Sequence, residues 1–116
     1  MALIRANTSG GGGGTIGPVP FTPNSAISSN TIVATQGLVS ITGEIVLNTS
    51  ITAGYILLSG LPAPSSAIDI VDGVKLKNTT STRKLTIDTS GNLKLASGES
   101  YMGEATWVLS VSYPPS

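Results

Sequence analysis

The sequence contains neither cysteine nor histidine. Without cysteine the chain can form no disulfide and no thiolate zinc site, so its stability must come from packing, to which oligomerisation could add. Without histidine it lacks the usual general base near neutral pH, the serine triad and the commonest metal ligand. We therefore expect a protein that is not an enzyme, with no catalytic residues, no metal and no cofactor.

Charged residues are scarce: the 116 residues include six Lys or Arg and six Asp or Glu, which cancel to a net charge of +0. Hydrophobic residues reach 40%, so Ser, Thr, Asn and Gly must cover much of the surface, which favours a sheet protein. The balanced charge also removes the attraction on which polyanion binding relies. Nucleic acid is therefore not an expected partner.

Long apolar runs are missing too, since nowhere do eighteen apolar residues follow one another. The apolar stretch in the opening "MALIRANTSGGGGG" is too short for a signal-peptide core. We expect neither membrane insertion nor a standard secretory signal. The glycine run at 10–14 predicts a flexible tether, so we divide the chain into an arm at 1–14 and one domain at 15–116.

Period-two alternation of apolar residues runs through most of the domain and predicts strands with one buried face. In "LVSITGEIVLN" four apolar residues share a face, and Gly43 marks a bulge or a close backbone approach. "SITAGYILLSGLPAP" predicts one strand that ends at the loop 60–64. "AIDIVDGVKLKN" predicts short strands joined in a tight hairpin at Asp72–Gly73, and "RKLTIDTSGNLKLAS" predicts a hairpin whose turn runs over 88–92.

The final run "GEATWVLSVSYPPS" holds the only tryptophan. Trp107 is either a core residue or an exposed platform for a ligand, and its apolar neighbours on the same face favour the core. With no helical spacing anywhere, we predict an all-β fold: an antiparallel β-sandwich of jelly-roll character, or a small barrel, with about seven to nine short strands. The expected core includes Ile41, Ile45, Trp107, Leu109, Val111 and Tyr113.

Three patterns could indicate catalysis or metal binding. "LTIDTSGNL" is similar to the active-site motif of viral aspartic proteases around Asp88, but Ser90 stands where that family has glycine, and the stretch also suits a hairpin turn. Asp69 and Asp72 could suggest calcium, but lysines stand where further ligands would be. A Ser–Lys dyad is formally available from Lys75, Lys77, Lys84 and Lys94, although these lysines alternate with apolar residues as solvent-facing positions do.

Four features in order carry a family resemblance: "GLVSITGEIVLN", an apolar strand ending in "LSGLPAP", "KLTIDTSGNLKL", and an aromatic-containing strand closing in "LSVSYPPS". Together they resemble the appendage domains of bacteriophage tails and baseplates, like the head domains of receptor-binding proteins, over about residues 37–116. The last strand of such domains often ends with a tyrosine, as at Tyr113. The length leaves no room for a long shaft, which favours a small decoration or accessory piece.

The resemblance implies a β-sandwich, usually a homotrimer, that is mounted on the virion after assembly in the cytoplasm of the bacterial host. Its partners would be copies of itself, other virion proteins and the host surface. In an adhesive role the chain binds host cell-wall saccharide, and Tyr101, in an expected loop flanked by the polar "GES" and by "MGE", is the best ligand-binding candidate. In a purely structural role it is a homo-oligomeric assembly protein without a ligand, and Tyr101 is an ordinary loop residue.

Overall fold

The computed structural model describes residues 19–35 and 38–114. The predicted arm at 1–14 and the predicted start of the domain at residue 15 lie outside these ranges. The described residues form eleven strands and no helix, and therefore no helix that could span a membrane. The strands are β1 (Thr22–Pro23), β2 (Ile27–Asn30), β3 (Val33–Thr35), β4 (Val39–Leu47), β5 (Ile51–Thr52), β6 (Ile56–Ser59), β7 (Ile68–Leu76), β8 (Thr82–Ile87), β9 (Leu93–Leu95), β10 (Tyr101–Met102) and β11 (Thr106–Tyr113).

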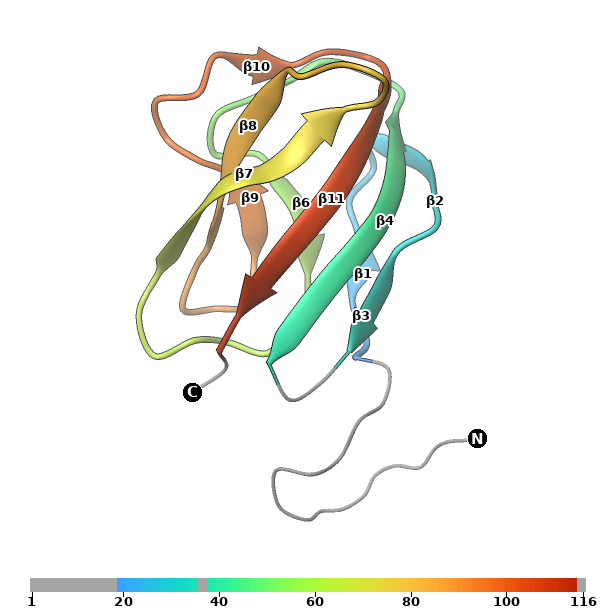
Figure 1. Cartoon of the computed structure of the whole chain (residues 1–116). Helices are drawn as coiled ribbons and strands as arrows, with labels where there is room; N and C mark the ends of the chain where they lie inside the picture. Colours follow the sequence, from blue (N-terminus) through green and yellow to red (C-terminus); the bar gives the residue numbers. More distant parts are fainter. Residues whose placement is uncertain (1–18, 36–37, 115–116) are drawn as a thin grey trace.

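Nine of these strands form one antiparallel sheet in the order β1-β6-β9-β8-β7-β11-β4-β2, with β3 also paired to β4. The sheet folds over on itself, so that β4 and β11 lie in front of β6 and β9 (Figure 1). Its two ends come together where Val19 N, just before β1, donates to Ala34 O of β3 at 2.7 Å. The protein is therefore the all-β antiparallel sandwich that the alternation predicts, closed almost into a barrel.

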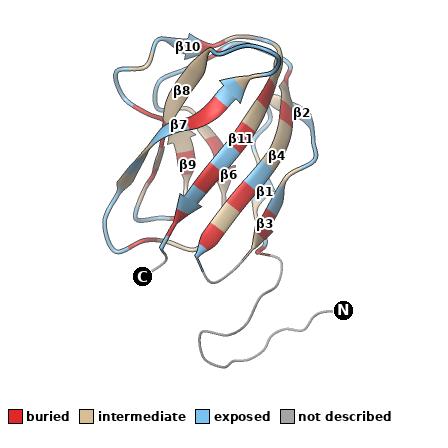
Figure 2. Ribbon diagram, in the orientation of Figure 1, coloured by how far each residue is buried: buried red, intermediate tan, exposed pale blue. Residues whose placement is uncertain are grey.

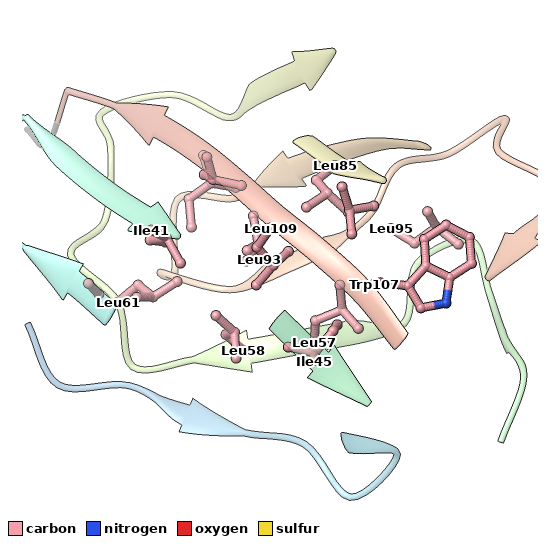
Figure 3. Packing of buried hydrophobic residues seen from close by; sticks show 14 of the residues in the cluster. Ile41, Ile45, Leu57, Leu58, Leu61, Leu85, Leu93, Leu95, Trp107 and Leu109 are labelled. Carbon is pink, nitrogen blue, oxygen red and sulfur yellow. The ribbon is translucent and has the colours of Figure 1, made fainter. Parts of the chain in front are cut away.

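The core fills the space between the two layers. Along β11 and β4 buried residues alternate with more exposed ones (Figure 2), which is the pattern of strands with one face inward. The six residues expected in the core, Ile41, Ile45, Trp107, Leu109, Val111 and Tyr113, are all at most 2% exposed. Figure 3 shows the indole of Trp107 at one end of this cluster, beside Leu95.

Gly43 lets one long strand pair with two short ones. Its φ is +138°, and a Cβ at this position would lie 2.6 Å from Thr31 O. The chain between β2 and β3 crosses β4 here: Thr31 N donates to Glu44 O at 2.9 Å, and Thr31 Oγ1 accepts from Glu44 N at 3.0 Å. The close backbone approach predicted at Gly43 is thus confirmed.

Two predicted elements are wrong in detail. The stretch 51–59 is two strands, because Gly54 takes a φ of +89° and its N–H donates to Leu95 O at 2.8 Å. Asp72 has the positive φ (+59°) expected of the Asp-Gly pair, but it lies in a bulge of a continuous β7, where the register with β8 shifts between Ile70 and Val74. The number of strands exceeds seven to nine because five of the eleven have only two or three residues.

Candidate functional site

A two-stranded sheet, β10 paired with β5, covers one end of the sandwich (Figure 1). Met102 pairs with Ile51, and both side chains are buried in the core. Successive side chains of a strand point to opposite faces, so Tyr101 faces outward, and it is 51% exposed. The residue that the sequence singled out therefore lies on a short strand and not in a loop.

Trp107 lies just behind this small sheet. Its side chain is 2% exposed, and its Nε1–H donates to Gly103 O at 2.9 Å. A buried indole thus has its one polar group paired, as buried tryptophans usually do. The same bond holds the segment that joins β10 to β11. Trp107 is a core residue and not an exposed stacking platform.

Arg83 closes the core above the indole. Its side chain is on the inner face of β8. The buried Leu85 and Ile87 lie two and four residues further on, and alternate residues of a strand share a face. Its guanidinium carbon lies 5.5 Å from the centroid of the Trp107 ring, which is cation–π distance. Arg83 Nε donates to Tyr101 O at 2.7 Å, and Arg83 Nη1 donates to Ser81 Oγ at 3.1 Å and to Thr82 O at 2.9 Å.

Tyr101, Gly103, Trp107 and Arg83 form a closed ring of contacts, which we call the end cluster. The Tyr101 ring lies against Gly103, since a Cβ there would be 3.5 Å from Tyr101 Cε2. Gly103 O accepts from Trp107, Trp107 lies under Arg83, and Arg83 binds Tyr101 O. The residue that carries the exposed ring is therefore bonded through its carbonyl oxygen to the cation that covers the indole. Sequence reasoning missed Arg83, although its spacing of two from Leu85 places it on the inner face.

Asp88 is engaged in its own hairpin turn. Its Oδ1 accepts from Ser90 N at 2.9 Å and from Asn92 N at 3.0 Å, while Oδ2 accepts from Asn92 Nδ2 at 3.3 Å and lies 3.4 Å from Lys94 Nζ. Desolvation raises the pKa of Asp88, but the hydrogen bonds from Asn92 and Ser90 outweigh it, so the pKa lies below its ordinary value of 3.8. The carboxylate thus stabilises the turn predicted over 88–92.

The other candidate residues are engaged in separate hydrogen bonds and ion pairs. Asp69 Oδ1 accepts from Thr86 Oγ1 and Asp72 Oδ1 accepts from Thr82 Oγ1, each at 2.7 Å. Within 19–35 and 38–114 no three Asp or Glu side chains come together as metal ligands. Ion pairs join Lys77 to Glu44, Lys84 to Asp69 and Lys94 to Asp88, at 3.2, 3.9 and 3.4 Å.

A second surface feature lies on the outer side of the front layer. The register aligns Thr35 with Ser40 and Ser112, and Val33 with Thr42 and Ser110, across β3, β4 and β11. We call the five hydroxyl-bearing residues the hydroxyl face. Val33 beside it is 57% exposed, and Leu38, just before β4, is 60% exposed. The hydroxyl face has no charged side chain, and its side chains are all small.

No protein-family model, curated protein or solved structure matches the chain. Functional proposals for it rest on its own residues and on the resemblance described above.

Proposed function

We propose that this chain is a non-enzymatic module of a bacteriophage virion, of the tail or baseplate appendage or decoration class, that attaches to the host surface. The β-sandwich with its long C-terminal strand agrees with the fold that the resemblance implies. Assembly in the host cytoplasm and mounting on the virion, next to other virion proteins, belong to the same proposal. The engagement of Asp88 within its own turn supports a contact function in preference to an aspartic protease.

The observation that carries attachment is the placement of Tyr101. Aromatic rings at protein surfaces bind the apolar faces of sugars. This ring is half-exposed, lies against Gly103, and belongs to a residue whose carbonyl oxygen accepts a hydrogen bond from Arg83. A ring whose freedom is reduced by contact with Gly103 loses less conformational entropy on binding than a fully free one. Host cell-wall saccharide is the ligand class that such a ring fits, in a surface with few other aromatic residues.

A purely structural, homo-oligomeric role is the second candidate, and the hydroxyl face favours it. An uncharged sheet surface with small side chains, beside the exposed Val33 and Leu38, suits contact with another copy of the chain. In this alternative the trimer expected from the resemblance buries the hydroxyl face, and no ligand binds.

A glycan array probed with the full chain, together with its mass by light scattering, separates the two roles. Attachment predicts saccharide signals that Tyr101→Ala abolishes and Tyr101→Phe, which keeps the ring, retains. A stable trimer with no saccharide signal would contradict attachment and favour the structural role. A monomer at high concentration would contradict the structural role.

A further inference from the structure

Arg83 has hydrogen-bond donors left over. A guanidinium carries five N–H groups, and three of them are used: Nε by Tyr101 O, and the two of Nη1 by Ser81 Oγ and Thr82 O. Within 19–35 and 38–114 no protein acceptor contacts Nη2. The two remaining N–H groups of Arg83 are therefore on a single nitrogen, in a group whose orientation the other three bonds hold.

The positive charge of Arg83 is also uncompensated. Three lysines of the described chain have carboxylate partners within 4 Å, whereas Arg83 has none. Its nearest aromatic neighbour, Trp107, attracts the cation through the ring face but carries no net charge. A half-buried cation gains most from an anion that reaches it in a partly desolvated site, because charge-assisted hydrogen bonds are stronger there.

The exposed Tyr101 ring belongs to the residue whose carbonyl binds Arg83 Nε. The Tyr101 carbonyl thus joins the guanidinium to the residue that carries the exposed ring, which brings both groups to this end of the sandwich. A neutral sugar could use the ring alone. A sugar with an anionic substituent could use both, stacking on Tyr101 while its carboxylate or phosphate accepts hydrogen bonds from Arg83 Nη2.

We propose that the end cluster is a binding site for acidic saccharides, in which Tyr101 contacts the sugar ring and Arg83 pairs with its anionic group. This inference rests on the proposed attachment to host glycans and names the chemical class of the ligand. Arg83 then has two roles. Its side chain covers Trp107 inside the protein, and its free N–H groups recognise the anionic group of a bound sugar.

Titration calorimetry with the full chain tests the site. The probes are oligogalacturonate, which carries carboxylates, phosphomannan oligosaccharide, which carries phosphates, and a maltooligosaccharide of the same length, which is neutral. We expect the acidic probes to bind at least about tenfold more tightly than the neutral one, as a charge-assisted contact implies. Binding of one acidic probe alone identifies its anion as the group recognised, and binding of both indicates recognition of charge.

Three variants locate the contact. Arg83→Met keeps an unbranched stem over Trp107 but removes the charge, and should weaken acidic probes by about tenfold or more. Tyr101→Ala should weaken acidic and neutral probes alike. Lys75→Met is the matched control, because Lys75 is an exposed cation of β7 with no ion pair within the described residues, and its loss should change affinity by less than about twofold.

Near-ultraviolet circular dichroism of Trp107 checks that each variant is folded. If Arg83→Met unfolds, two measurements on the parent protein still test the acidic site. The parent should bind acidic probes more tightly than the neutral probe, and high salt should remove this preference. Equal binding of neutral and acidic probes, or an unchanged affinity in folded Arg83→Met, would overturn the acidic site and leave glycan attachment intact. Absence of binding to every saccharide on the array would remove both.

Discussion

The hydroxyl of Tyr113, near the end of β11, donates to the carbonyl oxygen of Pro62 at 2.7 Å, across 51 residues of sequence. The Tyr113 side chain is buried, and burial raises the pKa of its hydroxyl to about 12. The bond joins the last strand to the loop between β6 and β7, two segments that share no strand pairing. One polar atom of a core tyrosine thus holds a loop against the sandwich.

Tyr113→Phe should destabilise the protein by about 1–2 kcal/mol, because it leaves the Pro62 carbonyl without its partner while keeping the ring in the core. Urea unfolding measures this change. Tyr55→Phe is the matched control, since Tyr55 is only half-buried and its hydroxyl accepts a longer bond, 3.1 Å, from Ala26 N. A loss as large in Tyr55→Phe as in Tyr113→Phe would contradict the role given to the Pro62 bond.

Gly91→Ala should lower the free energy of unfolding by about 2 kcal/mol or more. Gly91 has a φ of +80°, and a Cβ there would collide with Leu61 O, at a point where Leu61 N donates to Gly91 O at 3.2 Å. Gly98→Ala separates strain from collision, because Gly98 has a similar φ, +90°, with nothing within 4 Å of its added Cβ. We expect Gly98→Ala to cost about 1 kcal/mol. Equal midpoints of thermal unfolding for the two variants would argue against the Leu61 contact.

Alternation was sufficient to predict two of the three longest strands, β4 and β11, and the β8–β9 hairpin. β4, β11 and the β8–β9 hairpin each have one apolar face over several residues, and burial of that face determines the register. Short elements could not be predicted this way. β10 has two residues, too few for a period, so Tyr101 was assigned to a loop. The bulge at Asp72 was interpreted as a turn because the same positive φ serves both.

The end cluster could be predicted only in part. Its tryptophan follows from the alternation, and its tyrosine was proposed from its polar neighbours. Arg83 was missed because a charged residue is ordinarily assigned to the solvent face, even where its spacing from Leu85 places it inward. Whether such a residue reaches an indole depends on pairing of β7 with both β8 and β11, which joins strands distant in sequence. That relationship is a property of topology and not of any local pattern.

Trp107→Ala should destabilise the protein by about 3–5 kcal/mol, as for other large core aromatics, and should release the segment after β10 by removing the bond to Gly103. Trp107→Phe keeps most of the packing and loses the N–H donor, so it should cost clearly less. In the parent protein the single indole should fluoresce at short wavelength and shift to the red on unfolding. Emission typical of a fully hydrated indole in the native state would contradict its burial.

Acid stability should depend on Asp88. Because its folded-state pKa is lowered below 3.8, the carboxylate contributes stability that is fully present above that value and is lost as pH falls through the lowered folded-state pKa. Asp88→Asn keeps an oxygen acceptor for Ser90 and Asn92 but cannot titrate, so it should reduce stability near neutrality and lose less of it on acidification. Urea midpoints of both proteins, followed from about pH 7 to pH 2, measure this difference. Asp69→Asn, which removes an equal charge from outside the turn, serves as the control. If Asp88→Asn lost stability over the acid range as steeply as the parent, the hydrogen bonds of the turn could not be what lowers that pKa.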